Sequence, residues 1–214
     1  MASLEAIIEQ AIAEVSEGEL ARAREEFHAR TGAFEAGEPF YEERIRAFFD
    51  WLAIEREGGA VLRGLAARLP AEGETITALL RSMRSLYRVG ASRDGEHLVD
   101  CLLFGARFRL RSDEGPASRL GPGDVFDGRL AGVGGAVLLA PGPVFHPRQA
   151  HGALLGLLDQ ARAAGRCDGS LLDPLLRVRM RFDRFTSMHV RHVYRFDSID
   201  RTEILAAPWA RHAS

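Results

Sequence analysis

The stretch LYRVGASRDGEHLVDCLLF, residues 86–104, decides the fold class of this chain. Apolar residues alternate with polar ones on both sides of Asp94-Gly95, and this dipeptide is a strong signal for a tight turn between two antiparallel strands. Before Tyr87 the apolar residues recur instead at the spacing of a helix, about 3.6 residues. We therefore expect the chain to change from helical to sheet structure near Tyr87.

Turn residues continue to separate short apolar segments after this hairpin. Gly121-Pro122-Gly123 precedes one segment, and residues 132–135, Gly-Val-Gly-Gly, join it to the next. We interpret the segments as a small five-stranded antiparallel sheet that closes into a barrel, because closure removes the exposed edges of the sheet. The predicted strands are Leu86–Ser92, His97–Phe104, Ala106–Arg111, Asp124–Ala131 and Ala136–Leu139.

Helical periodicity occupies most of the remaining chain. In the first helix the apolar residues follow the i, i+3, i+4, i+7 rule, and Ser3 is placed to cap its N-terminus. Residues 188–196 alternate again, which indicates a terminal strand that adds to the sheet. The predicted helices are Leu4–Val15, Glu19–Arg30, one from Pro39 to Gly58-Gly59, Val61–Leu69, Glu74–Leu86, Arg148–Ala164 and one that begins after Asp173-Pro174.

These patterns predict an α+β protein. Residues 1–85 are expected to form a helical segment, and residues 86–196 a small antiparallel barrel with C-terminal helices that packs with the first segment as one unit. Residues 197–214 are expected to be a frayed tail. A chain of 214 residues, 46% of them hydrophobic, is long enough for a sizeable core.

Composition excludes several classes of protein. All 28 basic residues are arginine, so the chain cannot form a lysine Schiff base, a Walker A phosphate loop or a kinase-type lysine contact with ATP. No apolar run approaches the roughly 18 to 20 residues that span a bilayer. The start of the chain does not resemble a secretory signal, and two cysteines without a CxxC pair fit a reducing compartment. We expect a cytoplasmic protein.

Charge is unevenly distributed along the chain. Residues 1–57 carry 14 acidic residues and 6 arginines, whereas residues 58–214 carry 16 and 22. The most basic region is 177–195, where Asp183 is the only acid. Such a region can meet an acidic protein surface, acidic lipid or phosphates. It can also be a solvated helix face, or pair with the glutamates of the first three helices.

We hypothesise a non-catalytic cytoplasmic adaptor or regulatory protein that binds another protein, for example a small GTPase in signalling. The opposite charges of the two halves and the lack of catalytic motifs motivate this hypothesis. The apolar stripe of the first helix is a second candidate contact, which either covers the chain's own core or docks into a partner. The candidate contacts are Arg177, Arg181, Arg184, Arg191, Arg195, Ile8 and Ile12.

Two other functions are open. A nucleic-acid-binding protein would use the C-terminal arginines and a row of arginines on one predicted strand, Arg107, Arg109 and Arg111, although a net charge of −2 argues against a dedicated binder. An enzyme assembled from scattered residues would need a deep pocket with two or more convergent polar side chains.

Familiar catalytic and metal-binding motifs are missing from the sequence. It contains no GxSxG, HExxH or GxGxxG after a strand. His189 and His192 form an HxxH pair, but on the predicted strand they face opposite sides. Cys101 lies in an apolar stretch and is expected to be buried rather than reactive. We expect no cofactor and no metal.

Several segments together resemble the small-barrel segment of uncharacterised bacterial proteins, some of which carry SEC-C zinc modules. These segments are LYRV (86–89), LVDCLL (98–103) and LGPGDVFDGRL (120–130), and residues 27–34 and 44–51 are similar to hypothetical proteins of myxobacterial type. The resemblance implies a small barrel and no known activity. The zinc ligands of SEC-C modules do not occur here, so it implies no metal.

Overall fold

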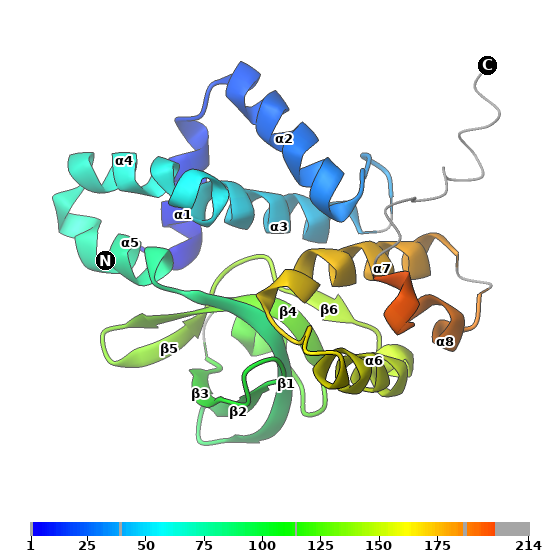
Figure 1. Cartoon of the computed structure of the whole chain (residues 1–214). Helices are drawn as coiled ribbons and strands as arrows, with labels where there is room; N and C mark the ends of the chain where they lie inside the picture. The colour runs from blue at the N-terminus through cyan, green and yellow to red at the C-terminus, as the bar shows by residue number, and fades with distance from the viewer. Residues whose placement is uncertain (1, 39, 114, 186–187, 200–214) are drawn as a thin grey trace, which may run out of the picture.

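The computed structural model of the chain describes residues 2–38, 40–113, 115–185 and 188–199, and it shows an α+β fold (Figure 1). The N-terminal part is a layer of helices. Ser3 and Ser16 cap the first two, each accepting a hydrogen bond from a backbone amide three residues later. The helices are α1 (Leu4–Ala13), α2 (Glu17–Thr31), α3 (Tyr41–Ile54), α4 (Ala60–Arg68) and α5 (Gly73–Leu80).

Six strands follow in the described part of the chain, and five of them close into a barrel. They are β1 (Met83–Arg93), β2 (Glu96–Cys101), β3 (Arg107–Arg111), β4 (Val125–Val133), β5 (Ala136–Leu139) and β6 (Val144–His146). The sheet order is β1-β2-β3-β5-β4-β6, and the further pairing of β1 with β4 closes the ring. The predicted barrel is confirmed, and its first hairpin turns at Asp94-Gly95, where both residues have positive φ.

The prediction of a wholly antiparallel sheet is wrong for one pair, because β3 and β5 run parallel. All other pairings are antiparallel. The reason is parity: five strands in a closed ring cannot all alternate in direction, so at least one neighbouring pair must run the same way.

Strand β1 begins earlier than the sequence predicts. Residues 83–86 continue the apolar pattern of α5, yet they pair with β4, with Met83 opposite Leu130 and Leu86 opposite Asp127. The sequence also gives no sign of β6, which pairs with the start of β4. In both places the hydrogen bonds offered by β4 outweigh the local helical pattern or supply a strand that the pattern lacks.

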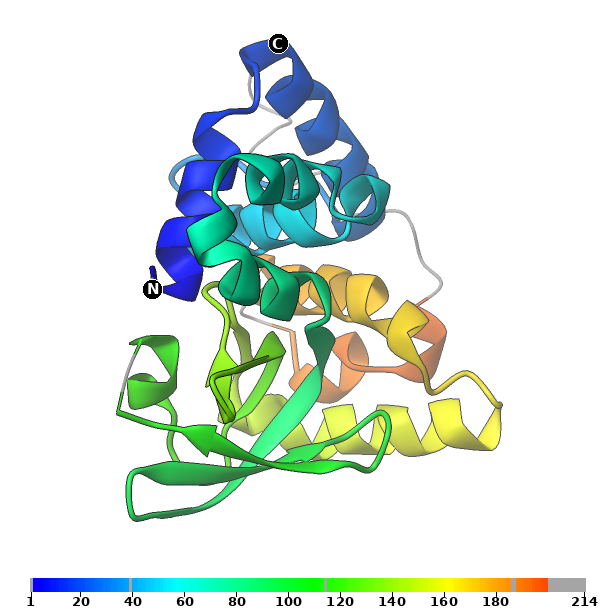
Figure 2. The same cartoon turned by 90° about the vertical axis from the view of Figure 1, so that its left-hand side faces the viewer.

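The C-terminal helices are α6 (His151–Ala163), α7 (Leu172–Arg184) and α8 (Val190–Val193). In both views α7 lies between the N-terminal helices and α6 (Figures 1 and 2). The predicted strand over 188–196 is wrong, because α8 occupies its centre. Val190, Val193 and Tyr194 also have the i, i+3, i+4 spacing of a helix, and this face packs on the core of α6 and α7. The predicted tail lies outside the described residues from 200 on.

Buried ion pairs join the helical layer to the barrel. Arg129 of β4 donates from Nε to Asp50 Oδ2 of α3 at 3.0 Å, and its Nη2 pairs with Glu55. A second pair lies within the barrel, where Arg84 of β1 bonds Asp127 of β4 at two points, 3.1 and 2.8 Å, and Arg84 also reaches Asp173 of α7 at 3.1 Å. Burial raises the pKa of the Asp50 carboxyl above its ordinary value, and Arg129 opposes the rise. Each of these carboxylates depends on its arginine to offset the cost of leaving water.

Gly59, at the start of α4, has a left-handed conformation with φ +78° that favours glycine. A Cβ there would lie 3.0 Å from the carbonyl oxygen of Ile54 and 2.5 Å from the Leu80 side chain. We expect Gly59→Ala to lower the free energy of unfolding by about 1–3 kcal/mol in urea titrations. Gly64→Ala is the matched control, because it is inside the same helix with nothing within 4 Å of its Cβ. It should gain about 0.5–1 kcal/mol, and equal effects would contradict the expectation.

Candidate ligand-binding site

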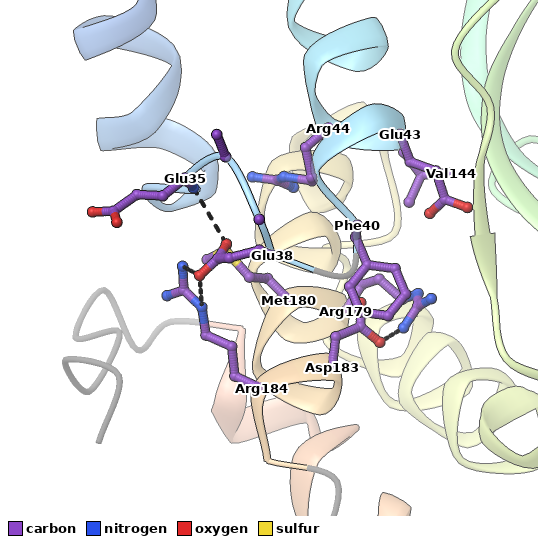
Figure 3. Close-up of a pocket in the computed structure, with 12 residues that line it drawn as sticks. Glu35, Glu38, Phe40, Glu43, Arg44, Val144, Arg179, Met180, Asp183 and Arg184 are labelled. Atoms are coloured by element: carbon purple, nitrogen blue, oxygen red, sulfur yellow. Dashed lines mark hydrogen bonds and ion pairs between the residues drawn. The ribbon is translucent and has the colours of Figure 1, made fainter. Parts of the chain in front are cut away.

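A cavity of about 470 Å³ lies where the start of α3 and the loop before it, residues 32–38, meet α7 and β6 (Figure 3). We call it the Arg44 cavity. Three arginines line it, Arg44, Arg179 and Arg184, together with four carboxylates. Its apolar surface comes from Phe40, Val144 and Met180. These residues belong to segments more than a hundred positions apart, which the fold brings together.

The loop before α3 is held from both ends. Phe34 is buried against Phe27 of α2, with ring centroids 6.4 Å apart in an edge-to-face arrangement. From the other side, Arg184 at the end of α7 donates from Nε to Glu38 Oε1 at 3.0 Å and from Nη2 to the carbonyl of Ala33 at 2.7 Å. Glu38 in turn accepts a hydrogen bond from the backbone amide of Glu35. The wall of the cavity is therefore tied to α2 and α7.

Arg44 is the most deeply buried cation of the cavity, with 3% of its surface exposed. Its Nη2 donates to the carbonyl and hydroxyl of Thr31, both at 2.9 Å, and to the Gly32 carbonyl at 3.2 Å. Its guanidinium also lies 5.7 and 5.3 Å from the ring centroids of Phe27 and Phe34. Burial lowers the pKa of Arg44 to about 10, helped by Arg84 and Arg184, so it stays charged at neutral pH.

Two of the nitrogen donors of Arg44 make no hydrogen bond within the described part of the chain. Its Nε and Nη1 are buried and have no hydrogen-bond partner there. Figure 3 places the guanidinium between α3 and the loop, at the edge of the cavity. A buried, unpaired donor of a charged group costs free energy, and native structures rarely leave one.

The opposite side of the cavity carries Arg179, Asp183 and Glu43. Arg179 forms an ion pair with Asp183 one helical turn on, donates from Nε to the Phe145 carbonyl at 2.7 Å, and stacks over Phe40 at 4.4 Å. Burial raises the pKa of Glu43 against the attraction of Arg179 and Arg46. Its Oε2 is buried and lacks a partner among the described residues.

The arginines predicted to contact a partner are used largely inside the chain. Arg177 donates to the carbonyls of Arg30 and Ile199, and Arg181 donates to the Ser198 carbonyl at 3.1 Å. Arg184 pairs with Glu38 and lines the Arg44 cavity. The sequence raised pairing with the glutamates of the first three helices, whereas the contacts seen here are backbone carbonyls for Arg177 and Arg181 and, for Arg184, Glu38 of the loop before α3. Arg191 is exposed, and Arg195 pairs with Asp197 at 3.0 Å.

The apolar stripe of α1 covers the chain's own core. Ile8 has 4% of its surface exposed and belongs to a cluster with residues of α3, α4 and α5. Ile12 is half-buried and packs against the same cluster. The assignment of Ile8 as a partner contact is wrong, because an amphipathic helix next to an unfilled core buries its stripe there first.

The arginine row on β3 is interleaved with acids. Arg107 donates to Asp100 at 2.7 Å on the neighbouring strand, and Arg111 pairs with Asp113 at 2.8 Å. Arg109 lies 3.7 Å from a carboxylate oxygen of Glu96. Arg107 and Arg109 are exposed and Arg111 is half-buried, and each phosphate that approached the row would compete with a carboxylate already in place.

Sequence reasoning missed Arg44 and Arg179. The available signal was position: Arg44, Phe48 and Trp51 share the i, i+4, i+7 face of α3 that packs into the core, and a lone arginine on such a face needs a special partner. Among the described residues, no group of three or more His, Cys, Asp or Glu is arranged to hold a metal ion. Likewise, the described helices include none with the length and apolarity to cross a membrane.

Comparisons with protein-family models, curated proteins and solved structures find no match for this chain. The resemblance to small-barrel bacterial proteins therefore stays a prediction, and function has to be inferred from the chain's own geometry.

Proposed function

We propose that this chain is a non-catalytic binding protein that takes a small organic molecule into the Arg44 cavity. The observation that carries the proposal is the combination of an apolar cavity of about 470 Å³ with a buried arginine whose Nε and Nη1 lack partners in the described chain. Small-molecule sites are typically about 300–1,000 Å³, mostly apolar, with a few placed polar groups. The Arg44 cavity has this size, and its surface is more apolar than polar although seven of its twelve lining residues are charged.

A regulatory role that acts on another protein, such as a small GTPase, stays a prediction. The cavity gives it a physical basis, since a ligand there would contact both α3 and α7 and so bear on how two layers of the fold pack. Arg191 and Arg195 are the candidate partner contacts that lie on the surface, whereas Arg184 belongs to the cavity. Nucleic-acid binding has less support because of the acids beside the β3 arginines.

Catalysis is a second candidate, and Glu43 favours it. A carboxyl group with a raised pKa in a cleft is typical of general acids. The Arg44 cavity also brings several polar side chains together, which the sequence analysis named as a requirement for an enzyme. However, the cavity lining that the structure describes contains no Ser, Thr, Cys, His or Tyr, and two of its three other carboxylates, Asp183 and Glu38, are held in ion pairs with Arg179 and Arg184. A binding function accounts for the residues that line the cavity and does not require these catalytic groups.

Filling the cavity tests the proposal. The probe is 8-anilinonaphthalene-1-sulfonate, which joins an apolar body to one anionic group and fluoresces when it leaves water. Ala36 lines the cavity from an exposed loop position, so Ala36→Trp can fill the space without enlarging the core. We expect one saturable site, and Ala36→Trp should weaken it at least about tenfold, a loss of about 1.4 kcal/mol.

The matched control is Ala33→Trp, in the same loop and exposed but outside the lining. It should bind the probe as the unaltered chain does. Equal binding by all three proteins would place the probe elsewhere on the surface and contradict the proposal.

A further inference from the structure

Within the described residues, Arg44 is the arginine of the Arg44 cavity that has no ion pair, and Asp127 and Asp173 attract it only from a greater distance. Arg179 is paired with Asp183, and Arg184 with Glu38. Arg44 has only neutral acceptors, the carbonyls and hydroxyl at the end of α2, and they engage a single nitrogen. A buried guanidinium with spare donors is the group that best receives a planar anion, because it can form charge-assisted hydrogen bonds out of competition with water.

The charge of the cavity limits which anion fits. Four carboxylates, of Glu35, Glu38, Glu43 and Asp183, face three guanidiniums. Because these carboxylates already outnumber the guanidiniums by one, each negative charge on the ligand adds repulsion, and only the first can be offset by contact with Arg44. A monoanion is therefore favoured over a phosphate dianion.

The remaining surface limits the rest of the ligand. Phe40, Val144 and Met180 present two aliphatic or thioether side chains and an aromatic ring, so the body of the ligand must be largely apolar. Glu43, with its raised pKa and buried Oε2, is suited to a single hydrogen bond with a polar atom of that body.

We propose that the Arg44 cavity selects a monocarboxylic acid with an apolar body, and that Arg44 holds its carboxylate through Nε and Nη1, which the carboxylate reaches by displacing the side chains that now shield them from solvent. This inference rests on the proposed binding function and adds the class of ligand. Arg44 is the residue that decides specificity, while Arg179 and Arg184 shape the walls through their own ion pairs.

A matched pair of probes tests the inference on the unaltered protein, with no variant that might fail to fold. The pair is 2-naphthoate and 2-naphthamide, which differ in charge and hardly in shape. One charged hydrogen-bonded contact is worth about 1.5–3 kcal/mol, so calorimetry should show that 2-naphthoate binds about 10–100-fold more tightly. A third probe, 2-naphthyl phosphate, should bind more weakly than 2-naphthoate near pH 8, where it is a dianion.

Variants then assign the effect to Arg44. In Arg44→Gln the preference for 2-naphthoate over 2-naphthamide should fall to within about twofold, whereas Arg46→Gln, which removes an exposed charge from the same helix outside the Arg44 cavity, should keep it. Circular dichroism and urea unfolding establish that the variants are folded.

The outcomes separate this inference from the binding function. If both probes bind equally and Ala36→Trp weakens both, the cavity binds ligands but the inference is overturned. Tighter binding of the phosphate would overturn the choice of a monoanion. If neither probe binds at millimolar concentration, the inference fails as well, and the result with 8-anilinonaphthalene-1-sulfonate decides separately whether the cavity binds anything.

Discussion

Arg129→Met is expected to lower the free energy of unfolding by about 3–5 kcal/mol, because it leaves a buried carboxylate without its cation. Asp50 is 8% exposed, and its Oδ2 accepts from Arg129 while its Oδ1 has no partner in the described chain. Methionine fills most of the space of the arginine stem, so the loss measures the charge rather than a cavity. Urea unfolding at pH 7 gives the value.

A second substitution tests whether the loss comes from the unpaired charge of the Asp50 carboxylate. In the unaltered chain, Asp50→Asn should destabilise, because it removes one partner of an ion pair. In the Arg129→Met background the same change should stabilise, since a neutral amide costs less to bury than a carboxylate. Arg107→Ala is the control, because its pair with Asp100 is on the surface and should be worth at most about 1 kcal/mol. A loss at Arg129 no larger than this control would contradict the expectation.

The stability of the protein is expected to fall steeply in mild acid because of His146. This side chain is buried, with Nδ1 3.0 Å from the Tyr194 hydroxyl, and burial lowers its pKa to about 3, helped by Arg179 and His151. In the unfolded chain the pKa is about 6.5. Above that pH the group is neutral in both states. Below pH 6.5, His146 is protonated in the unfolded state but stays neutral in the folded state. The free energy of unfolding therefore decreases by about 1.4 kcal/mol per pH unit, or about 3 kcal/mol by pH 4.

Comparison of variants isolates this contribution. His146→Gln keeps a hydrogen-bonding group near Tyr194 but cannot titrate, so its free energy of unfolding should change less between pH 6.5 and 4. His28, whose pKa is about 4, acts in the same direction, and Asp50 and Asp127, whose pKa values burial raises, act in the opposite one. All three are present in both proteins and cancel in the difference. His192→Gln makes the same substitution at an exposed position and controls for the exchange itself. Parallel profiles for His146→Gln and the unaltered chain would refute the assignment.

His146 and His192 show how little of a side chain's surroundings the sequence pattern predicts. Both occur in segments whose neighbours alternate or repeat, and nothing in the local pattern separates buried His146 from exposed His192. The same holds for the arginines. Arg177 and Arg181 have the spacing of a solvent-facing stripe, but they donate hydrogen bonds to carbonyls at the end of α2 and in residues 198–199. Partners that lie far away in the sequence leave no periodic signal at the residue they engage.

The sequence by itself determined the elements that depend on near neighbours. The change of period near Tyr87, the turn at Asp94-Gly95 and the apolar stripe of α1 each follow from forces that act within a few residues, namely turn conformation and burial of one face. Because these forces act between residues that are close in the sequence, the sequence pattern alone is enough to predict the elements they form.

Only the tertiary structure decided how the barrel closes and where a ligand can bind. The parallel pairing of β3 with β5 follows from the odd number of strands in the ring, and β6 exists because β4 has a free edge. The Arg44 cavity combines α3, α7 and β6, and its unmatched cation becomes visible only when every neighbour of Arg44 is known. Closure and charge balance are properties of the whole assembly, because each depends on which distant groups meet.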